Sequence, residues 1–168
     1  MKYLLILFLS TCLNSSAFTL VKQRNRTSTN VLTVELKKKI KQETGGLDEA
    51  DIMKYSIELT ASYLSFSSRN NITQHKANCV GYANLCSNIC NYALKVNHMY
   101  GYAKPVVGYI KFNSLNLCDI LVQIMPNRRL KLFVKDHDFV EFYFGNHIIY
   151  ADPCAYDLIN EYCMTFKE

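Results

Sequence analysis

Cys79 is the residue of this sequence best suited by its position to act as a nucleophile. It follows Asn78, a residue type that caps helix N-termini, and it heads an apolar stripe with steps of three and four residues. At the first turn of a helix, the dipole and the unpaired N–H groups favour a thiolate over a thiol. The same N–H groups can face the oxyanion that develops when a thiolate attacks an acyl carbon. A buried structural cysteine is the alternative interpretation.

His137 and Asp152 form a candidate base and carboxylate, because a predicted hairpin places them on one face of a sheet. Two runs with strand composition flank the turn dipeptide Gly145-Asn146. With a two-residue loop, Asp152 lies opposite Phe139, and His137 becomes its diagonal neighbour. Diagonal backbones lie about 7–8 Å apart, which lets a carboxylate meet an imidazole nitrogen. A surface pair without a role is the alternative.

The acidic neighbours of His137 fail this register test. Asp136 and Asp138 point to the other face, because successive strand side chains alternate. The sheet therefore selects Asp152 as the partner of His137. Together with Cys79, this pair matches the logic of nucleophilic catalysis, in which a carboxylate orients the imidazole that moves the proton.

The elements that must position these residues are helices in the first part of the chain and strands in the second. The predicted helices cover residues 31–42, 48–67 and 79–96. The predicted strands cover residues 105–112, 119–124, 130–134, 137–144 and 147–151. This order predicts an α+β fold in which helices, one of them starting at the nucleophile, pack on an antiparallel sheet.

The 168 residues suffice for one domain with a hydrophobic core of its own. We expect residues 47–168 to form the catalytic domain. Residues 18–46 read as an N-terminal linker followed by a short helix, because residues 18–30 are mostly polar.

Residues 1–17 are expected to be a signal peptide. Lys2 precedes the apolar run Tyr3–Leu9, and Asn14–Ala17 supplies small residues for cleavage. The run is too short to span a bilayer, so we predict no transmembrane segment. The sequence before Cys12 also approaches a bacterial lipobox, so the mature chain is expected to begin near Phe18 or at a lipidated Cys12. Either start predicts a secreted, periplasmic or cell-envelope protein.

Six cysteines follow Cys12, and in an oxidising compartment an even set can form disulfides. If one is a catalytic thiol, at least one other stays unpaired. Cys86 and Cys90 lie four apart on one expected helix face, which favours buried free thiols. The cysteine and histidine spacing predicts no metal site, and no cofactor is expected. The basic run Lys37–Lys41 lacks interleaved aromatic residues and reads as a solvated helix face, so no nucleic-acid partner is expected.

Four segments of the sequence resemble the transglutaminase-like superfamily, which has a papain-like fold and includes small secreted members of bacterial type. The segments are Asn78–Leu85, Tyr102–Tyr109, His137–Glu141 and Tyr150–Pro153. By this resemblance, the first starts the nucleophile helix, the second enters the sheet, and the last two carry the catalytic histidine and the Asp-Pro that orients it. The resemblance spans about residues 48–157.

The sequence departs from the family pattern in three places. The family usually has Trp two residues after the histidine, where this chain has Phe139, and a small residue before the cysteine, where it has Asn78. The usual Arg-x-x-Gly-Ile-Pro before Tyr102 is missing. These departures concern the substrate cleft more than Cys79, His137 and Asp152.

Three functions are compatible with the sequence. The first is a thiol hydrolase that cleaves amide bonds of a protein or peptide through an acyl-enzyme on Cys79, with His137 and Asp152. The second is a protein-glutamine transglutaminase, which passes the same acyl group to an amine. The third is a non-catalytic binding module that retained the fold. No residue of the sequence decides between water and amine as the acceptor.

Overall fold

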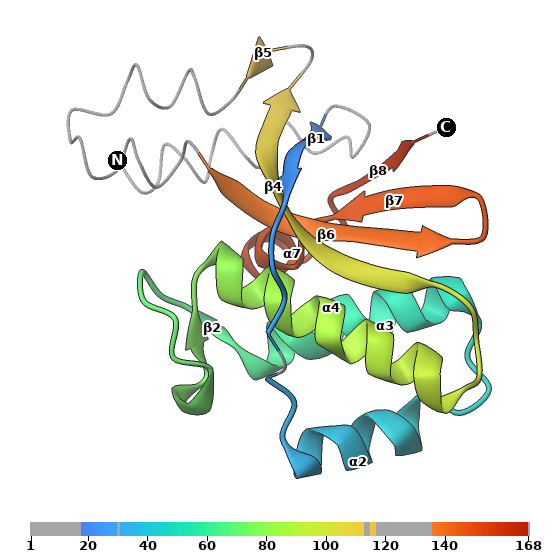
Figure 1. The fold of residues 1–168 in the computed structure, drawn as a ribbon. Coiled ribbons are helices and arrows are strands. Elements are labelled where there is room, and N and C mark those ends of the chain that lie inside the picture. The colour runs from blue at the N-terminus through green and yellow to red at the C-terminus, as the bar shows by residue number, and fades with distance from the viewer. Residues whose placement is uncertain (1–17, 30, 113–114, 117–135, 168) are drawn as a thin grey trace.

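An antiparallel sheet packed on helices makes up the part of the chain that the structure, a computed structural model, describes: residues 18–29, 31–112, 115–116 and 136–167 (Figure 1). The predicted α+β class is confirmed. The proposed signal peptide with Cys12, the predicted strands at 119–124 and 130–134, and Cys118 lie outside the described residues.

Three helices begin directly after a side chain that accepts a backbone N–H group from the first turn. They are α2 (Val34–Glu43) after Thr33, α3 (Glu49–Tyr63) after Asp48 and α4 (Cys79–Val96) after Asn78. All three were expected, but α3 ends at Tyr63 rather than near Ser67. The chain leaves the helix there because β2 (Ser65–Phe66) pairs in parallel with β3 (Lys76–Ala77), across the 3₁₀ turn η2 (Ile72–Gln74).

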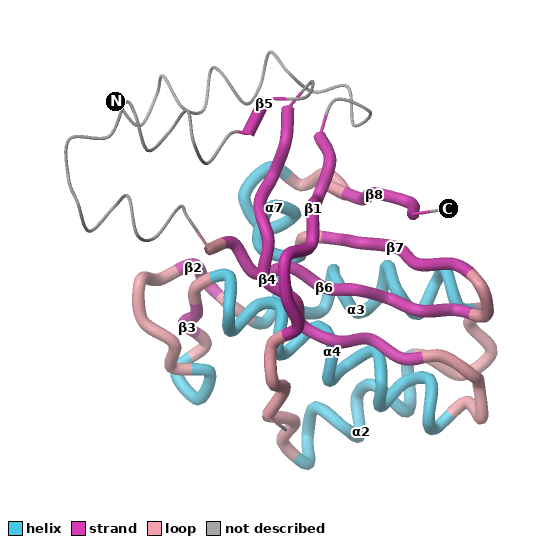
Figure 2. Tube along the Cα trace, turned by 45° about the horizontal axis from the view of Figure 1, so that its top comes forward, coloured by secondary structure: helices cyan, strands magenta, loops and turns pink. Residues whose placement is uncertain are grey.

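The main sheet is antiparallel throughout, with strand order β1-β4-β6-β7-β8 and with β5 paired to β4 (Figure 2). Its strands are β1 (Phe18–Asn25), β4 (Tyr102–Phe112), β5 (Leu115–Asn116), β6 (His137–Phe144), β7 (His147–Ala151) and β8 (Met164–Lys167). The sheet is curled, and its two edge strands approach each other: the Leu20 N–H on β1 donates to Thr165 Oγ1 on β8 at 2.9 Å. This bond joins the two ends of the strand order.

Each face of the curled sheet buries its own hydrophobic cluster. Leu20, Val106, Phe139 and Tyr150 pack together on one face. On the other, α4 lies against β4 and β6, and α2 and α3 pack on α4 (Figure 1). The N-terminus of α4 is thereby held beside the sheet.

The prediction of a linker over residues 18–30 is wrong for residues 18–25, which form β1 and pair with β4. Two cations of β1, Lys22 and Arg24, form ion pairs with acids on or beside β6. Lys22 Nζ lies 2.7 Å from Glu141 Oε2 on β6, and that carboxylate is nearly buried. The segment is therefore part of the same sheet as the hairpin.

A further helix, α7 (Pro153–Ile159), was not predicted from the sequence. It follows β7 immediately and is capped at its N-terminus by Asp152, with proline at its first position. Its seven residues carry too little apolar periodicity to indicate a helix. The dipeptide Asp152-Pro153 is the signal that could have revealed it, since it combines an N-cap with a favoured first residue.

Candidate active site

Cys79 occupies the first position of α4, as the sequence predicts. Asn78 Oδ1 accepts the Val80 N–H at 3.1 Å, and the Asn78 N–H donates to Asn70 Oδ1 at 2.9 Å. These two bonds fix the start of the helix. Cys79 itself is only 6% exposed, so its thiol faces neighbouring side chains more than bulk solvent.

The hairpin has the register that the turn dipeptide predicts. Phe144 pairs with His147, and Val140 pairs with Ala151, at the end of β7. His137 Nε2 meets Asp152 Oδ2 at 2.5 Å. The expected contact between the imidazole and this carboxylate is thus present, and the tight turn at Gly145 (φ 56°) is what sets it.

Asp152 uses its two carboxylate oxygens for different tasks. While Oδ2 meets the imidazole, Oδ1 accepts the N–H groups of Cys154 and Ala155, each at 3.0 Å. The side chain is 0% exposed. Helix capping therefore holds the carboxylate in an orientation that leaves its second oxygen facing His137.

His137 lies between this carboxylate and Cys79. Burial lowers the pKa of His137, but the charge and hydrogen bond of Asp152, together with a hydrogen bond to Cys79, outweigh it and raise the pKa well above 6.5. Because Nε2 meets Asp152, Nδ1 is the ring nitrogen left for Cys79. The imidazole is 20% exposed, so solvent reaches the histidine but not the carboxylate.

The two acids beside His137 are engaged elsewhere. Asp136 pairs with Arg24 at 3.1 Å, and buried Asp138 pairs with Arg26, both arginines belonging to the N-terminal segment. Burial raises the pKa of Asp138, although Arg26 opposes the rise. The prediction that these acids face away from the His137–Asp152 pair is confirmed.

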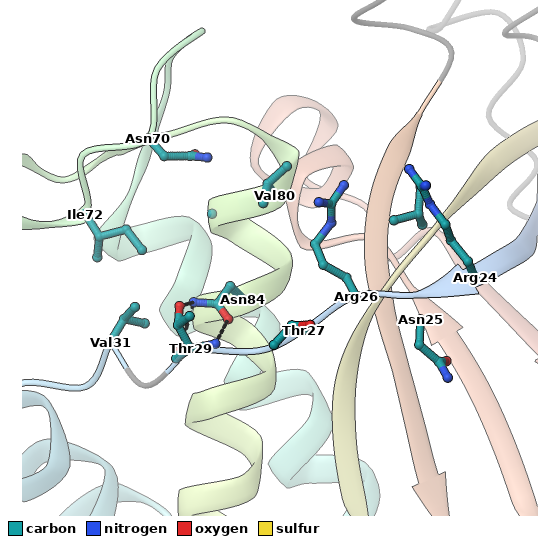
Figure 3. Close-up of a pocket in the computed structure, with 12 residues that line it drawn as sticks. Arg24, Asn25, Arg26, Thr27, Thr29, Val31, Asn70, Ile72, Val80 and Asn84 are labelled. Atoms are coloured by element: carbon teal, nitrogen blue, oxygen red, sulfur yellow. Dashed lines mark hydrogen bonds between the residues drawn. The ribbon is translucent and has the colours of Figure 1, made fainter.

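A cleft of about 530 Å³ lies beside the first turn of α4 (Figure 3). Val80 and Gly81, which follow Cys79 directly, line one wall, and Arg26 extends between this turn and the strands. Neither Cys79 nor His137 nor Asp152 lines it. The cleft therefore adjoins the three residues without containing them.

Residues 26–29, here called the strap, cross α4 at this cleft. The Asn84 carboxamide donates to the Thr29 carbonyl at 3.0 Å and accepts the Thr29 N–H at 2.9 Å. Asn88 donates to the same carbonyl at 2.9 Å. Sequence reasoning missed the strap, since asparagines on a helix reveal nothing about which distant backbone they bind.

The other described cysteines are free and unlike reactive thiols. Burial raises the pKa of Cys90 to about 12 and of Cys163 to about 12, and it raises the pKa of Cys86 and Cys154 as well. Cys86 and Cys90 are fully buried, as expected. These four thiols are protonated near neutral pH.

Within the described part of the chain, no cluster of three or more His, Cys, Asp or Glu side chains has metal-binding geometry. The described helices include none long and apolar enough to cross a membrane. Comparison with known proteins finds no matching family model, no matching curated protein and no matching solved structure. The geometry of Cys79, His137 and Asp152 therefore carries the functional argument.

The raised pKa of His137 predicts a pH-dependent contribution to stability. A group whose pKa is higher in the folded state contributes stability below its unfolded pKa of 6.5, and the contribution is lost as pH rises through the folded value. We expect the loss of unfolding free energy in His137→Gln to be largest near about pH 6 and smaller near about pH 9. Urea unfolding of both proteins across this range measures it. A loss that grows with pH would contradict the protonated His137–Asp152 pair.

Proposed function

We propose that the protein is a thiol hydrolase that cleaves amide bonds of a protein or peptide substrate. The observation that carries the proposal is the contact of His137 Nε2 with Asp152 Oδ2 at 2.5 Å, with Cys79 among the groups that raise the pKa of the same imidazole. Acyl transfer through a covalent intermediate requires a nucleophile, a base beside it and a carboxylate that orients the base.

In the proposed reaction, Cys79 Sγ attacks the carbonyl carbon of the substrate amide while the proton of the thiol resides on His137 Nδ1. The C–S bond forms, the C–N bond breaks, and His137 gives the proton to the departing amine. Water then attacks the thioester, His137 takes a proton from it, and the carboxylic acid leaves as the thiol is restored. Asp152 stabilises the imidazolium in both steps.

We further propose a papain-like core of the transglutaminase-like type. What supports this is a helix with the nucleophile at its first position, packed on an antiparallel sheet whose hairpin supplies the histidine and the aspartate. The proposal that the protein is exported rests on the sequence of residues 1–17 alone.

Thiol labelling tests whether Cys79 is activated. We expect iodoacetamide at about pH 6 to modify Cys79 and to spare the other described cysteines, whose pKa values are raised by burial. Peptide mass spectrometry identifies the modified residue. His137→Gln should abolish the selective reaction, because the imidazolium that stabilises the thiolate is lost. An unreactive Cys79 in the wild type would favour the non-catalytic binding module.

The intact mass of a casein-like substrate, incubated with the protein and a primary amine, then separates the two reactions. Peptide cleavage or deamidation supports hydrolysis, with water as the acceptor. Incorporation of the amine in place of hydrolysis would instead assign the protein as a transglutaminase. Cys79→Ala is the control, because it leaves either reaction without a nucleophile.

A further inference from the structure

The acyl transfer proposed above needs hydrogen-bond donors for the oxyanion, and the start of α4 offers one beside the nucleophile. Among the first amides, the Val80 N–H is taken by Asn78 Oδ1 and the Tyr82 N–H by the Asn78 carbonyl. The Cys79 N–H has no acceptor among the described residues. An amide on the nucleophile itself is well placed to bind the oxygen of the carbonyl that its thiol attacks.

Asn70 brings a side-chain carboxamide to the same end of the helix. Its Oδ1 accepts the Asn78 N–H at 2.9 Å, one residue before the nucleophile. Figure 3 shows the side chain of Asn70 extending toward the α4 turn that carries Val80, along the wall of the cleft. No described residue accepts a hydrogen bond from Asn70 Nδ2, so its two N–H donors are available to a ligand.

Gly81 allows this close approach of Asn70 to the helix. A Cβ atom at Gly81 would lie 2.7 Å from Asn70 Oδ1 and 2.5 Å from Ala77 Cβ, distances that require one of them to move. In a helix, alanine is otherwise favoured over glycine by about 1 kcal/mol. The hydrogen bond from the Asn78 N–H to Oδ1 therefore holds the Asn70 carboxamide in place, and the absence of a side chain at Gly81 leaves room for it.

We propose that Asn70 Nδ2 is the side-chain donor of the oxyanion hole and acts together with the Cys79 N–H. When Cys79 Sγ bonds to the carbonyl carbon, the C=O electron pair moves onto oxygen, and both donors bind that oxyanion. When the C–N bond breaks, the pair returns and the carbonyl re-forms. This inference rests on the proposed thiol chemistry, and it assigns Asn70 a role beyond capping the start of α4.

Two reactions of the same thiol separate these roles. Acylation by p-nitrophenyl acetate passes through an oxyanion, whereas alkylation by iodoacetamide displaces iodide at a saturated carbon and develops none. Asn70→Asp keeps the acceptor for the Asn78 N–H but removes the amide donor, and Asn70→Ala removes both. We measure each rate at the pH where it no longer rises, so that the thiol is fully ionised. There we expect both variants to lose about 10²–10³-fold in the rate of acylation. The rate of alkylation of the two variants at the same pH should stay within about threefold of the wild-type rate.

Asn25→Asp is the matched control for the charge that Asn70→Asp introduces. Asn25 is exposed and lines the same cleft, yet it lies on β1 and no described contact joins it to α4. It should acylate at the wild-type rate. Wild-type acylation in Asn70→Asp would overturn the proposal and leave Asn70 as a helix cap. A parallel loss of alkylation would also overturn it, by assigning the defect to Cys79 activation.

Failure of the thiol chemistry itself gives a different result. A wild type that neither releases p-nitrophenol nor takes up iodoacetamide at Cys79 would overturn the proposed function, and the role of Asn70 with it. Acylation by the wild type with unaffected Asn70 variants overturns only the oxyanion assignment.

Discussion

Cys79→Ala is expected to abolish acyl transfer while leaving the fold nearly intact. Removing the nucleophile of a triad lowers the rate by about 10⁴-fold or more, because no other group can form the covalent intermediate. The cost in unfolding free energy should be about 1 kcal/mol or less, since one sulfur atom is lost at a helix end beside a cleft. Release of p-nitrophenol and urea unfolding measure the two effects separately.

Cys90→Ala is the matched control for this substitution. Cys90 lies on the same helix and is fully buried. The variant should keep its activity and lose about 1–2 kcal/mol of stability. If Cys79→Ala instead retains activity, or fails to fold while Cys90→Ala folds, then Cys79 is structural and the enzyme proposal fails.

Substitution of Asp152 should give the second large effect, and the two available variants should differ. In Asp152→Asn, Oδ1 can still cap α7, but an amide N–H now faces His137 Nε2 and stabilises the wrong tautomer of the imidazole. We expect a loss of about 10³–10⁴-fold in activity with a modest loss of stability. Asp152→Ala also removes the cap that binds the Cys154 and Ala155 N–H groups, which costs about 1–2 kcal/mol more.

The activity of His137→Ala shows which of the two residues, His137 or Asp152, contributes more to the reaction. The imidazole carries the proton, whereas the carboxylate orients and stabilises it, so activity should fall further in His137→Ala than in Asp152→Asn. Acylation rates compare the activity of His137→Ala with that of Asp152→Asn. Urea unfolding compares the stability of Asp152→Asn with that of Asp152→Ala. Equal stability of Asp152→Asn and Asp152→Ala would contradict the capping role, and wild-type activity in Asp152→Asn would contradict the triad.

The sequence by itself determined the local geometry around the candidate site. The cap residue Asn78 and the apolar stripe after it place Cys79 at a helix start, and α4 begins there. The turn at Gly145 fixes the register of β6 with β7, because a two-residue loop leaves one pairing. Both signals act over a few residues, so they can be read without knowledge of the rest of the chain.

The tertiary structure alone decided which distant segments meet. Residues 18–25 look polar in sequence and become β1, because their pairing with β4 and the ion pair of Lys22 with Glu141 supply stability that no local pattern encodes. The contact of Cys79 with His137 is likewise a product of α4 packing on the sheet. The second task of Asp152, capping α7, ties the geometry of the His137–Asp152 pair to a helix whose own periodicity is too weak to predict. Long-range contacts of this kind depend on packing, which propensity and spacing do not specify.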